Sequence, residues 1–240
     1  MSKQTLQSEI LDVIGPRIIG NGYAAGQVLR TEDWESEFDV SRTVLREALK
    51  VLESMRLIEM RRKIGVTVLP ESDWNVFDPR IIRWRLAGPE RERQIHSLTE
   101  LRLSVEPVAA RNAATRASDV QRVALLYHAT QLEDAGVRRD LESLHEHDIA
   151  YHRLLLAASG NELFGALSAI VAEVLPVTGH LVHDVIPEHQ TEPPNHLHSI
   201  AAKAIVDGDA DAAETATRAL LLEVHDQMQH AYNVAMRAQQ

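Results

Sequence analysis

Apolar residues recur at helical spacing through the start of this 240-residue chain. Four of them follow one another every four residues and predict an amphipathic first helix: Leu6, Ile10, Ile14 and Ile18. Gly20 and Gly22 end that helix. Thr31 can cap a second helix that runs to Phe38, and Asp39 then makes the turn into a third.

The third predicted helix has two faces of different character. Ser41 can cap it, because a serine oxygen accepts a hydrogen bond from a free backbone N–H in the first turn. One face carries apolar residues that need a core: Leu45, Ala48, Leu49 and Leu52. Arg42 and Arg46 share the opposite face. Such arginines can read guanine in a DNA major groove, although a pair at this spacing is also common on a solvated helix face.

Two short apolar segments, 57–60 and 66–69, follow and read as strands joined by a basic tip. The tip holds Arg61, Arg62, Lys63 and Gly65. Residues 41–63 contain seven Lys or Arg and three Glu, so this segment carries +4 although the whole chain carries −10. A basic region on an acidic body is compatible with specific nucleic-acid binding.

The remaining chain is predicted to be helical. Residues 71–95 read as a linker with a short helix at 80–86, and Trp74 and Trp84 are expected to pack that linker onto a domain. Six further helices are expected, at 96–115, 119–136, 140–158, 161–184, 195–207 and 210–236, with Gly136 and Gly160 as C-terminal stops. The predicted fold is mainly α, with a winged helix-turn-helix domain at 1–70, the linker, and an antiparallel all-α bundle at 96–240.

Composition narrows the class of protein. The chain has no cysteine, which excludes disulfides, cysteine zinc sites and thiol catalysis. The first residues show no apolar signal segment, and no apolar run approaches the roughly 20 residues of a membrane helix. We therefore expect a cytoplasmic protein with no membrane partner.

Residues 4–70 resemble the winged helix-turn-helix domain of GntR-type bacterial transcription factors. The resemblance rests on the ordered segments 26–29, 40–43, 45–49, 52–53, 57–58 and 65–66. It implies that the third helix and the wing tip contact DNA, through Ser41, Arg42, Thr43, Arg46, Lys63 and Gly65. One position departs from the family: Asp33 stands where many members have a basic residue that touches DNA, so operator preference is expected to differ.

Asp148 and His152 lie four residues apart, with His145 one turn earlier. A carboxylate and an imidazole on one helix face can bind zinc or a similar divalent ion together with imidazoles from other helices. Chance placement of surface histidines is the alternative, because the chain has 12.

Residues 96–236 resemble the FCD ligand-binding domain of the FadR subfamily within the same family. The matching positions are Glu100, Arg102, 105–107, 109–110, Asp148, His152, 159–161, His198, Ile200, 208–209 and 212–213. The resemblance implies that Asp148, His152 and His198 bind a metal and that Arg102 holds the carboxylate of an effector. For Arg102, a structural ion pair with Glu100 or Glu106 is the alternative.

The resemblance also implies a fourth metal ligand, a histidine on the last helix, but the matching position here is Leu220, which cannot bind a metal. His225 lies too far round the helix to replace it. Three possibilities stay open: His196 or His145 substitutes, water or effector completes a three-ligand metal, or Asp148, His152 and His198 bond the effector without metal.

The resemblances imply a repressor of a catabolic operon, dimeric on palindromic double-stranded DNA and released by a small carboxylate. A finer likeness, at 74–84 and 100–107, is to the sugar-acid branch of the galactonate-repressor kind. Two other classes remain as alternatives: a metal-dependent enzyme acting on a small carboxylic acid through the Asp/His cluster, and a helical module whose N-terminal domain binds protein. The sequence lacks H-E-x-x-H, G-x-S-x-G and P-loop motifs.

Overall fold

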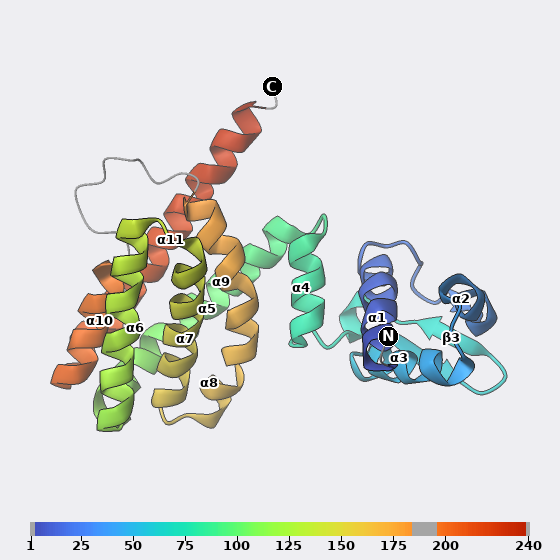
Figure 1. Cartoon of the computed structure of the whole chain (residues 1–240), viewed down its shortest axis with the longest axis horizontal. Coiled ribbons are helices and arrows are strands. Elements are labelled where there is room, and N and C mark those ends of the chain that lie inside the picture. Colours follow the sequence, from blue (N-terminus) through green and yellow to red (C-terminus); the bar gives the residue numbers. More distant parts are fainter. Residues whose placement is uncertain (1–2, 184–195, 239–240) are drawn as a thin grey trace. The chain divides into compact units, whose positions relative to one another are not determined.

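The computed structural model describes residues 3–183 and 196–238. The chain divides into two compact units, residues 1–94 and residues 95–240. Figure 1 labels the elements of both units.

The first unit combines helices with a small sheet (Figure 1). Its elements are α1 (Lys3–Ile19), β1 (Val28–Leu29), α2 (Thr31–Phe38), α3 (Arg42–Ser54), β2 (Ile58–Arg61), β3 (Gly65–Val68), a 3₁₀ turn (Glu71–Asp73) and α4 (Pro79–Ala87). The second unit is helical within its described residues. It contains most of α5 (Arg91–Arg116), and then α6 (Asp119–Arg138), α7 (Leu141–Ala158), α8 (Glu162–Ala166), α9 (Ser168–His183), α10 (His196–Asp207) and α11 (Ala210–Ala238). The predicted fold class, a winged helix-turn-helix followed by a helical bundle, is confirmed.

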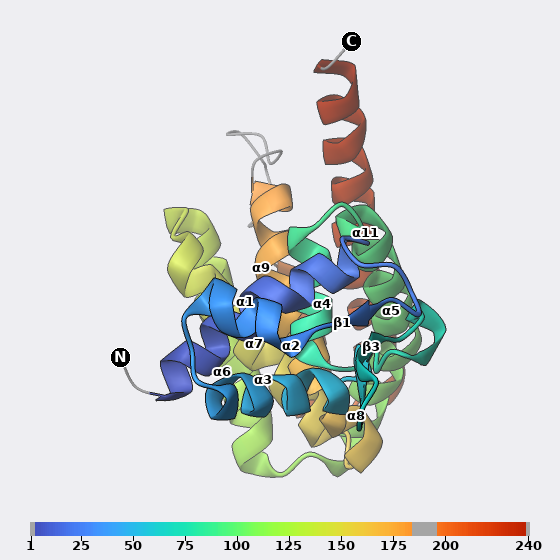
Figure 2. The same ribbon diagram turned by 90° about the vertical axis from the view of Figure 1, so that its right-hand side faces the viewer.

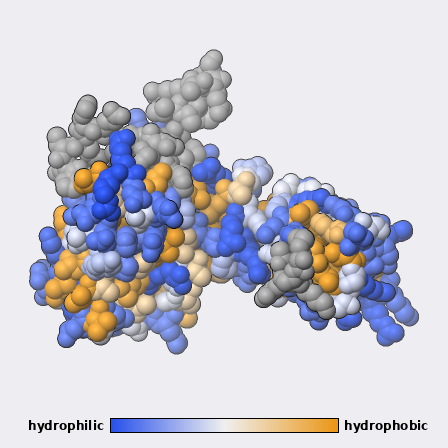
Figure 3. All heavy atoms as spheres, viewed as in Figure 1, coloured by the Kyte–Doolittle hydropathy of each residue, from blue (hydrophilic) through white to orange (hydrophobic). Residues whose placement is uncertain are grey.

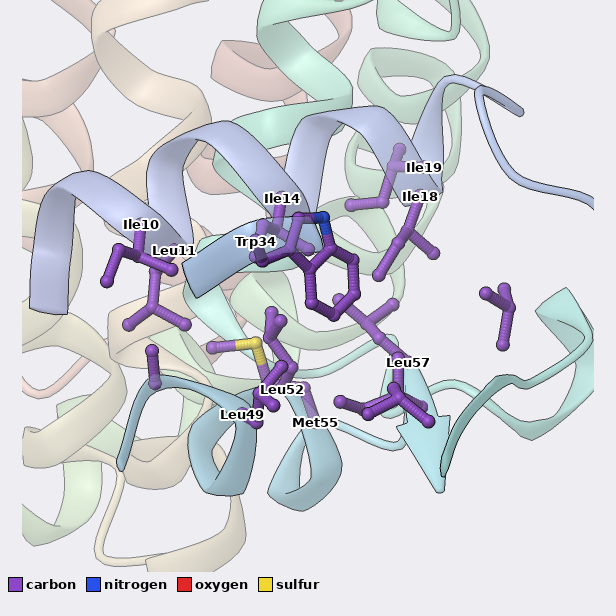
Figure 4. Packing of buried hydrophobic residues seen from close by; sticks show 14 of the residues in the cluster. Ile10, Leu11, Ile14, Ile18, Ile19, Trp34, Leu49, Leu52, Met55 and Leu57 are labelled. Carbon is purple, nitrogen blue, oxygen red and sulfur yellow. The ribbon is translucent and has the colours of Figure 1, made fainter. Parts of the chain in front are cut away.

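The core of the first unit lies between α1 and α3, which pack against one another (Figure 2). Figure 4 shows Ile10, Ile14 and Ile18 of α1 facing Leu49 and Leu52 of α3, with the indole of Trp34 between the helices. The isoleucines and leucines are residues that the helical spacing predicted, and all of these side chains, including Trp34, are at most 3% exposed. Their burial removes apolar surface from water and fixes which face of α3 stays outside.

Three antiparallel strands form the sheet, in the order β1, β3, β2. The β2–β3 hairpin is the predicted wing, with Arg61 opposite Gly65. Gly65 has a positive φ of 114°, and an added Cβ would lie 3.0 Å from the carbonyl oxygen of Leu29. Glycine is therefore required there both by the backbone conformation and by the close approach of β1.

Helix α4 folds as part of the first unit. The Trp84 ring occupies the space beside Gly15 of α1, where a Cβ would come within 2.3 Å of it. The indole N–H of Trp84 donates to the carboxylate of Asp12 at 3.1 Å, and Ile81 is fully buried in the same core. Glu71 accepts from the guanidinium of Arg85 at 2.9 Å, which ties α4 to the end of the wing.

The second unit buries many small residues in its core. Its main core includes buried alanines of α5, α6, α10 and α11 around Tyr151 and Leu155 of α7. Arg122 of α6 donates to the carbonyls of Ala114 and Ala117 at the end of α5, at 2.7 and 3.2 Å, and also to Ile205 near the end of α10. A cation at two helix C-termini satisfies carbonyls that lack helical partners.

Three local predictions were wrong. Thr31 does not cap α2: it is the first helical residue, Arg30 precedes it without a side-chain cap, and the acids Glu32 and Asp33 favour that helix end instead. Gly136 does not end α6, which continues to Arg138 before Arg139 turns left-handed at φ 55°. The predicted helix at 161–184 is divided at Leu167 into α8 and α9, and its last residue lies outside the described residues.

In the part of the chain that the structure describes, no helix has both the length and the apolar character needed to span a membrane. Figure 3 shows polar residues over much of the visible surface, with apolar residues gathered over α6 and α10 of the second unit. The exposed apolar side chains on those two helices are Val120, Val123, Tyr127, Val137, Ile200 and Val206.

Candidate functional site

Helix α3 presents an open basic face. Ser41 caps the helix as predicted, accepting from the backbone N–H of Val44 at 3.5 Å. Arg42, Thr43 and Arg46 are exposed. Among the described residues, neither of these arginines has an ion-pair partner, whereas the neighbouring Lys50 pairs with Glu47 at 2.7 Å. The guanidinium groups that the sequence singled out are thus available to an anionic or base partner.

The wing tip is the second basic feature of this unit. Arg62 and Lys63 are exposed in the loop between β2 and β3, and Lys63 has a positive φ of 69°. Arg61 differs from them because it pairs with Glu59 at 2.9 Å. Asp33, the departure from the family pattern, is exposed in the first turn of α2.

A buried polar cluster lies in the second unit. Asp148 and His152 come from one face of α7, and His198 comes from α10. One ligand atom from each of these three side chains lies within 4.8 Å of the others. The Nε2 atoms of His152 and His198 are each 3.3 Å from the same oxygen, Oδ1 of Asp148. The structure therefore brings together the three residues that the sequence predicted.

The protonation of His152 follows from its partners. Its Nδ1 lies 2.6 Å from Oε2 of Glu106, so Nδ1 carries a proton and donates to that carboxylate. When a second proton is present, Nε2–H donates to Oδ1 of Asp148. In the neutral tautomer, Nε2 keeps a lone pair that can bind a cation or accept from a neighbouring N–H.

Arg102 and Glu106, one turn apart on α5, complete the cluster. The guanidinium Nε of Arg102 donates to Oε1 of Glu106 at 2.6 Å, and its Nη2 lies 3.2 Å from Nε2 of His152. Arg102 is 5% exposed and Glu106 is fully buried. The ion pair with Glu106 that stood as the alternative role of Arg102 is thus present, and it uses one of the five N–H donors of the guanidinium.

Opposite charges hold these groups ionised despite burial. Burial alone would raise the pKa of Glu106, but Arg102 and His152 outweigh it and lower the pKa to about 2. The pKa of Asp148 is likewise lowered, since hydrogen bonds from His152 and His198 outweigh its burial. Burial alone would lower the pKa of His152, but the Glu106 carboxylate raises it, and the net result is a raised pKa.

The donor set suits a divalent metal. Two ligand atoms at zinc bond lengths and a tetrahedral angle would be about 3.4 Å apart, close to the separations from Asp148 to each histidine. The contact of Glu106 with His152 is the carboxylate–histidine arrangement that orients metal-binding imidazoles. Leu220, at the expected fourth position, is buried and apolar, so these residues fit a metal with three protein ligands.

The other histidines that the sequence considered are not members of this group in the described part of the chain. His145 and His196 do not replace the fourth ligand there. His225 instead lies edge-on to His96 of α5, with the ring centroids 6.3 Å apart.

Two residues of the cluster were not predicted as members. Glu106 was considered only as a partner of Arg102, yet it bridges Arg102 and His152. Tyr151 packs its ring edge-on against His152 and His198, and its hydroxyl donates to the backbone carbonyl of His198 at 3.4 Å. Burial raises the pKa of Tyr151, so the hydroxyl stays protonated and holds α10 beside α7.

Each of the two units matches a known protein-family model. The model of the gntR family of bacterial regulatory proteins matches residues 6–68, and the FCD domain model matches residues 97–223. The galactonate operon transcriptional repressor of Escherichia coli K12 is 33% identical over 168 residues, which cover 69% of this chain and 72% of that protein. The Uxu operon transcriptional regulator of the same strain is 31% identical over 165 residues, 68% of this chain and 62% of that protein.

A solved structure, that of Lar, which controls expression of the Listeria monocytogenes agr system, has the same fold with a TM-score of 0.62. The superposition covers 97% of this chain and 97% of that chain, and the two sequences are 14% identical. The relatives are named as transcriptional regulators, so the comparisons lend no support to the alternatives of a metal-dependent enzyme or a protein-binding module. The chain belongs to the GntR family of bacterial transcriptional regulators and carries an FCD domain.

Proposed function

We propose that the protein is a repressor of a catabolic operon that leaves its operator when a small carboxylate, a sugar acid, binds the second unit. The observation that carries the proposal is the presence in one chain of an open arginine face on α3 and a buried Arg102–Asp148–His152–His198 cluster. The first feature suits DNA and the second suits a polar acid. The name of the galactonate repressor relative supports the choice of sugar acids.

The proposed DNA contacts come from two elements. Arg42 and Arg46 read base edges in the major groove, while Ser41 and Thr43 contact the backbone beside them. Lys63 and Gly65 bring the wing tip to the minor groove. One α3 covers only a half-site, so the protein acts as a homodimer on a palindromic operator. We propose the cytoplasm as its location, where that DNA lies.

The proposed effector site combines charge and hydrogen bonding. Arg102 binds the carboxylate through guanidinium donors other than the one given to Glu106. Asp148, His152 and His198 hold a divalent ion of the zinc type, which when bound supplies a Lewis-acidic partner for effector oxygens. By linkage, an inducer that weakens DNA binding must itself bind the DNA-bound form less well.

The test measures binding of the purified protein to promoter DNA of its own locus by fluorescence anisotropy, with and without aldonates. The proposal expects salt-dependent binding that one aldonate reverses in a saturable way. Random DNA of equal length is the control. Equal affinity for both DNAs would reject specific operator recognition, and specific binding that no acid alters would reject the inducer role.

A further inference from the structure

Thr217 of α11 differs from the other threonines inside long helices. Thr99, Thr130 and Thr215 each donate their hydroxyl to a backbone carbonyl four residues earlier, at 2.8 to 2.9 Å. Thr178 and Thr115 likewise bond carbonyls of the preceding turn. Thr217 is fully buried, and its hydroxyl has no hydrogen-bond partner among the described residues.

A buried hydroxyl without a partner opposes folding, because it loses its hydrogen bonds to water. Valine has the same shape and would avoid that cost. The presence of a hydroxyl at this position therefore indicates a hydrogen-bonding partner that the described residues do not provide.

Two independent features place Thr217 level with the buried cluster along the bundle. Helices α5 and α11 run antiparallel, since Arg218 donates to the carbonyl of Leu103 at 3.5 Å and Arg111 pairs with Glu214 at 3.4 Å. This register puts Thr217 beside the segment 103–106, which ends at Glu106. The turn at Gly208 joins α10 to α11. His198 lies ten residues before Gly208 and Thr217 nine residues after it, so the two residues lie at about the same distance along their helices from this turn.

The orientation of α11 gives Thr217 an inward position. Thr217 and Leu220 lie on one face and are both buried, while Arg218 and Ala219 between them are exposed. Leu220 offers no polar atom, so on this stretch of α11 the hydroxyl of Thr217 is the inward polar group. It lies at the level where Arg102, His152 and His198 gather from α5, α7 and α10.

We propose that Thr217 is a specificity-determining residue that hydrogen-bonds a hydroxyl group of the effector. The inference rests on the proposed function and narrows its ligand class to polyhydroxylated carboxylates. The carboxylate binds Arg102, and one hydroxyl further along the acid binds Thr217. A plain alkanoate of the same length leaves the Thr217 hydroxyl without a partner and is discriminated against.

The experiment measures Kd by isothermal titration calorimetry for the full-length wild type and three variants, Thr217→Val, Thr217→Ser and Thr215→Val. The probes are D-galactonate, D-gluconate, the monodeoxy analogues of the acid that binds better, and hexanoate. Thr215→Val is the matched control, because Thr215 lies on the same helix but is exposed and bonds its own backbone.

We expect Thr217→Val to weaken binding of the aldonate about tenfold, the size of one lost hydrogen bond. Thr217→Ser and Thr215→Val retain the wild-type Kd within about threefold, less than the loss of such a bond. One monodeoxy analogue binds wild type and Thr217→Val equally well, since it lacks the hydroxyl concerned. Without effector, Thr217→Val unfolds at the same temperature as the wild type or higher.

Three results overturn the inference. If Thr217→Val binds the aldonate as tightly as the wild type does, Thr217 makes no contact with the effector. An equal loss for every analogue, accompanied by a less stable protein without effector, makes Thr217 a structural residue. If the wild type binds no aldonate, the proposed sugar-acid function is rejected together with this inference. If the wild type binds an aldonate and Thr217→Val binds it equally well, only the inference about Thr217 is rejected.

Discussion

Arg46 and Arg102 are the same side chain in opposite settings. Arg46 projects from α3 into solvent with no ion-pair partner among the described residues, whereas Arg102 is 5% exposed and bonds Glu106 at 2.6 Å. An exposed guanidinium keeps its water until a ligand replaces it. A buried guanidinium must be neutralised within the fold. The first arginine is thus expected to matter only for DNA, and the second for both folding and effector binding.

The largest expected effect is on stability. Replacing Arg102 with Ala leaves the Glu106 carboxylate buried beside His152 alone, and loss of one partner of a buried pair costs about 3–5 kcal/mol of unfolding free energy. Urea denaturation followed by circular dichroism measures this loss.

Arg218→Ala is the matched control for Arg102, because Arg218 pairs with Glu214 at 3.4 Å but is about half exposed. It should cost less than about 1 kcal/mol. If both variants are equally stable, the contrast between buried and exposed arginines fails. The double variant Arg102→Met with Glu106→Gln should recover part of the stability.

The second-largest expected effect tests the proposed metal site of the helical unit. Zinc at 100 times its Kd should stabilise a protein that binds it only when folded by about 2.7 kcal/mol. His198→Gln should lose this stabilisation because one of three ligands is removed. His225→Gln, a change on α11 beside His96, should retain it. Equal responses of the two variants to zinc would contradict a site at Asp148, His152 and His198.

Arg46→Ala tests the other side of the comparison. We expect a loss of about 1–3 kcal/mol in operator binding and relaxed sequence preference, with unchanged thermal stability. Anisotropy titrations with operator and random DNA measure both quantities. Arg138→Ala, an exposed arginine of α6, serves as the control for net charge. Equal weakening on both DNAs would make Arg46 a phosphate contact rather than a base contact.

The smallest effect concerns the start of α3. Ser41→Ala removes the cap on Val44, and N-cap loss typically costs about 1 kcal/mol. Because the bond is long at 3.5 Å, a value at the lower end, roughly 0.5 kcal/mol, is expected for the unfolding free energy. Ser41→Asp should restore the cap yet weaken DNA binding through its charge. A capped variant with full DNA affinity would show that Ser41 lies away from the phosphates.

The sequence predicted features that depend on local spacing. The buried face of α3, its Ser41 cap and the shared face of Asp148 and His152 follow from residues within a few turns of one helix. Features made by distant residues were missed. Strand β1 has only two residues and exists through pairing with β3, so no periodicity could reveal it.

The same limit applies to the buried cluster. Its member from α10, His198, could be named only through the family resemblance, because nothing in the spacing connects it with α7. Glu106 and His152 are 46 residues apart, and only the packing of α5 against α7 brings them within 2.6 Å. The division of the predicted helix at Leu167 also went unseen, although Gly165 beside the break is a weak helix former.

The fit of Trp84 beside Gly15 has a consequence for how such regulators can be recombined. A DNA-binding unit that ended at residue 70 would lack Trp84 and Ile81. The apolar surface that these two residues cover in the core of the first unit would then be exposed. A chimera that transplants this DNA specificity onto a foreign sensor should therefore join the two parts after residue 94 and carry α4 with the head. Any new sensor inherits α4 as its attachment point, whatever molecule it detects.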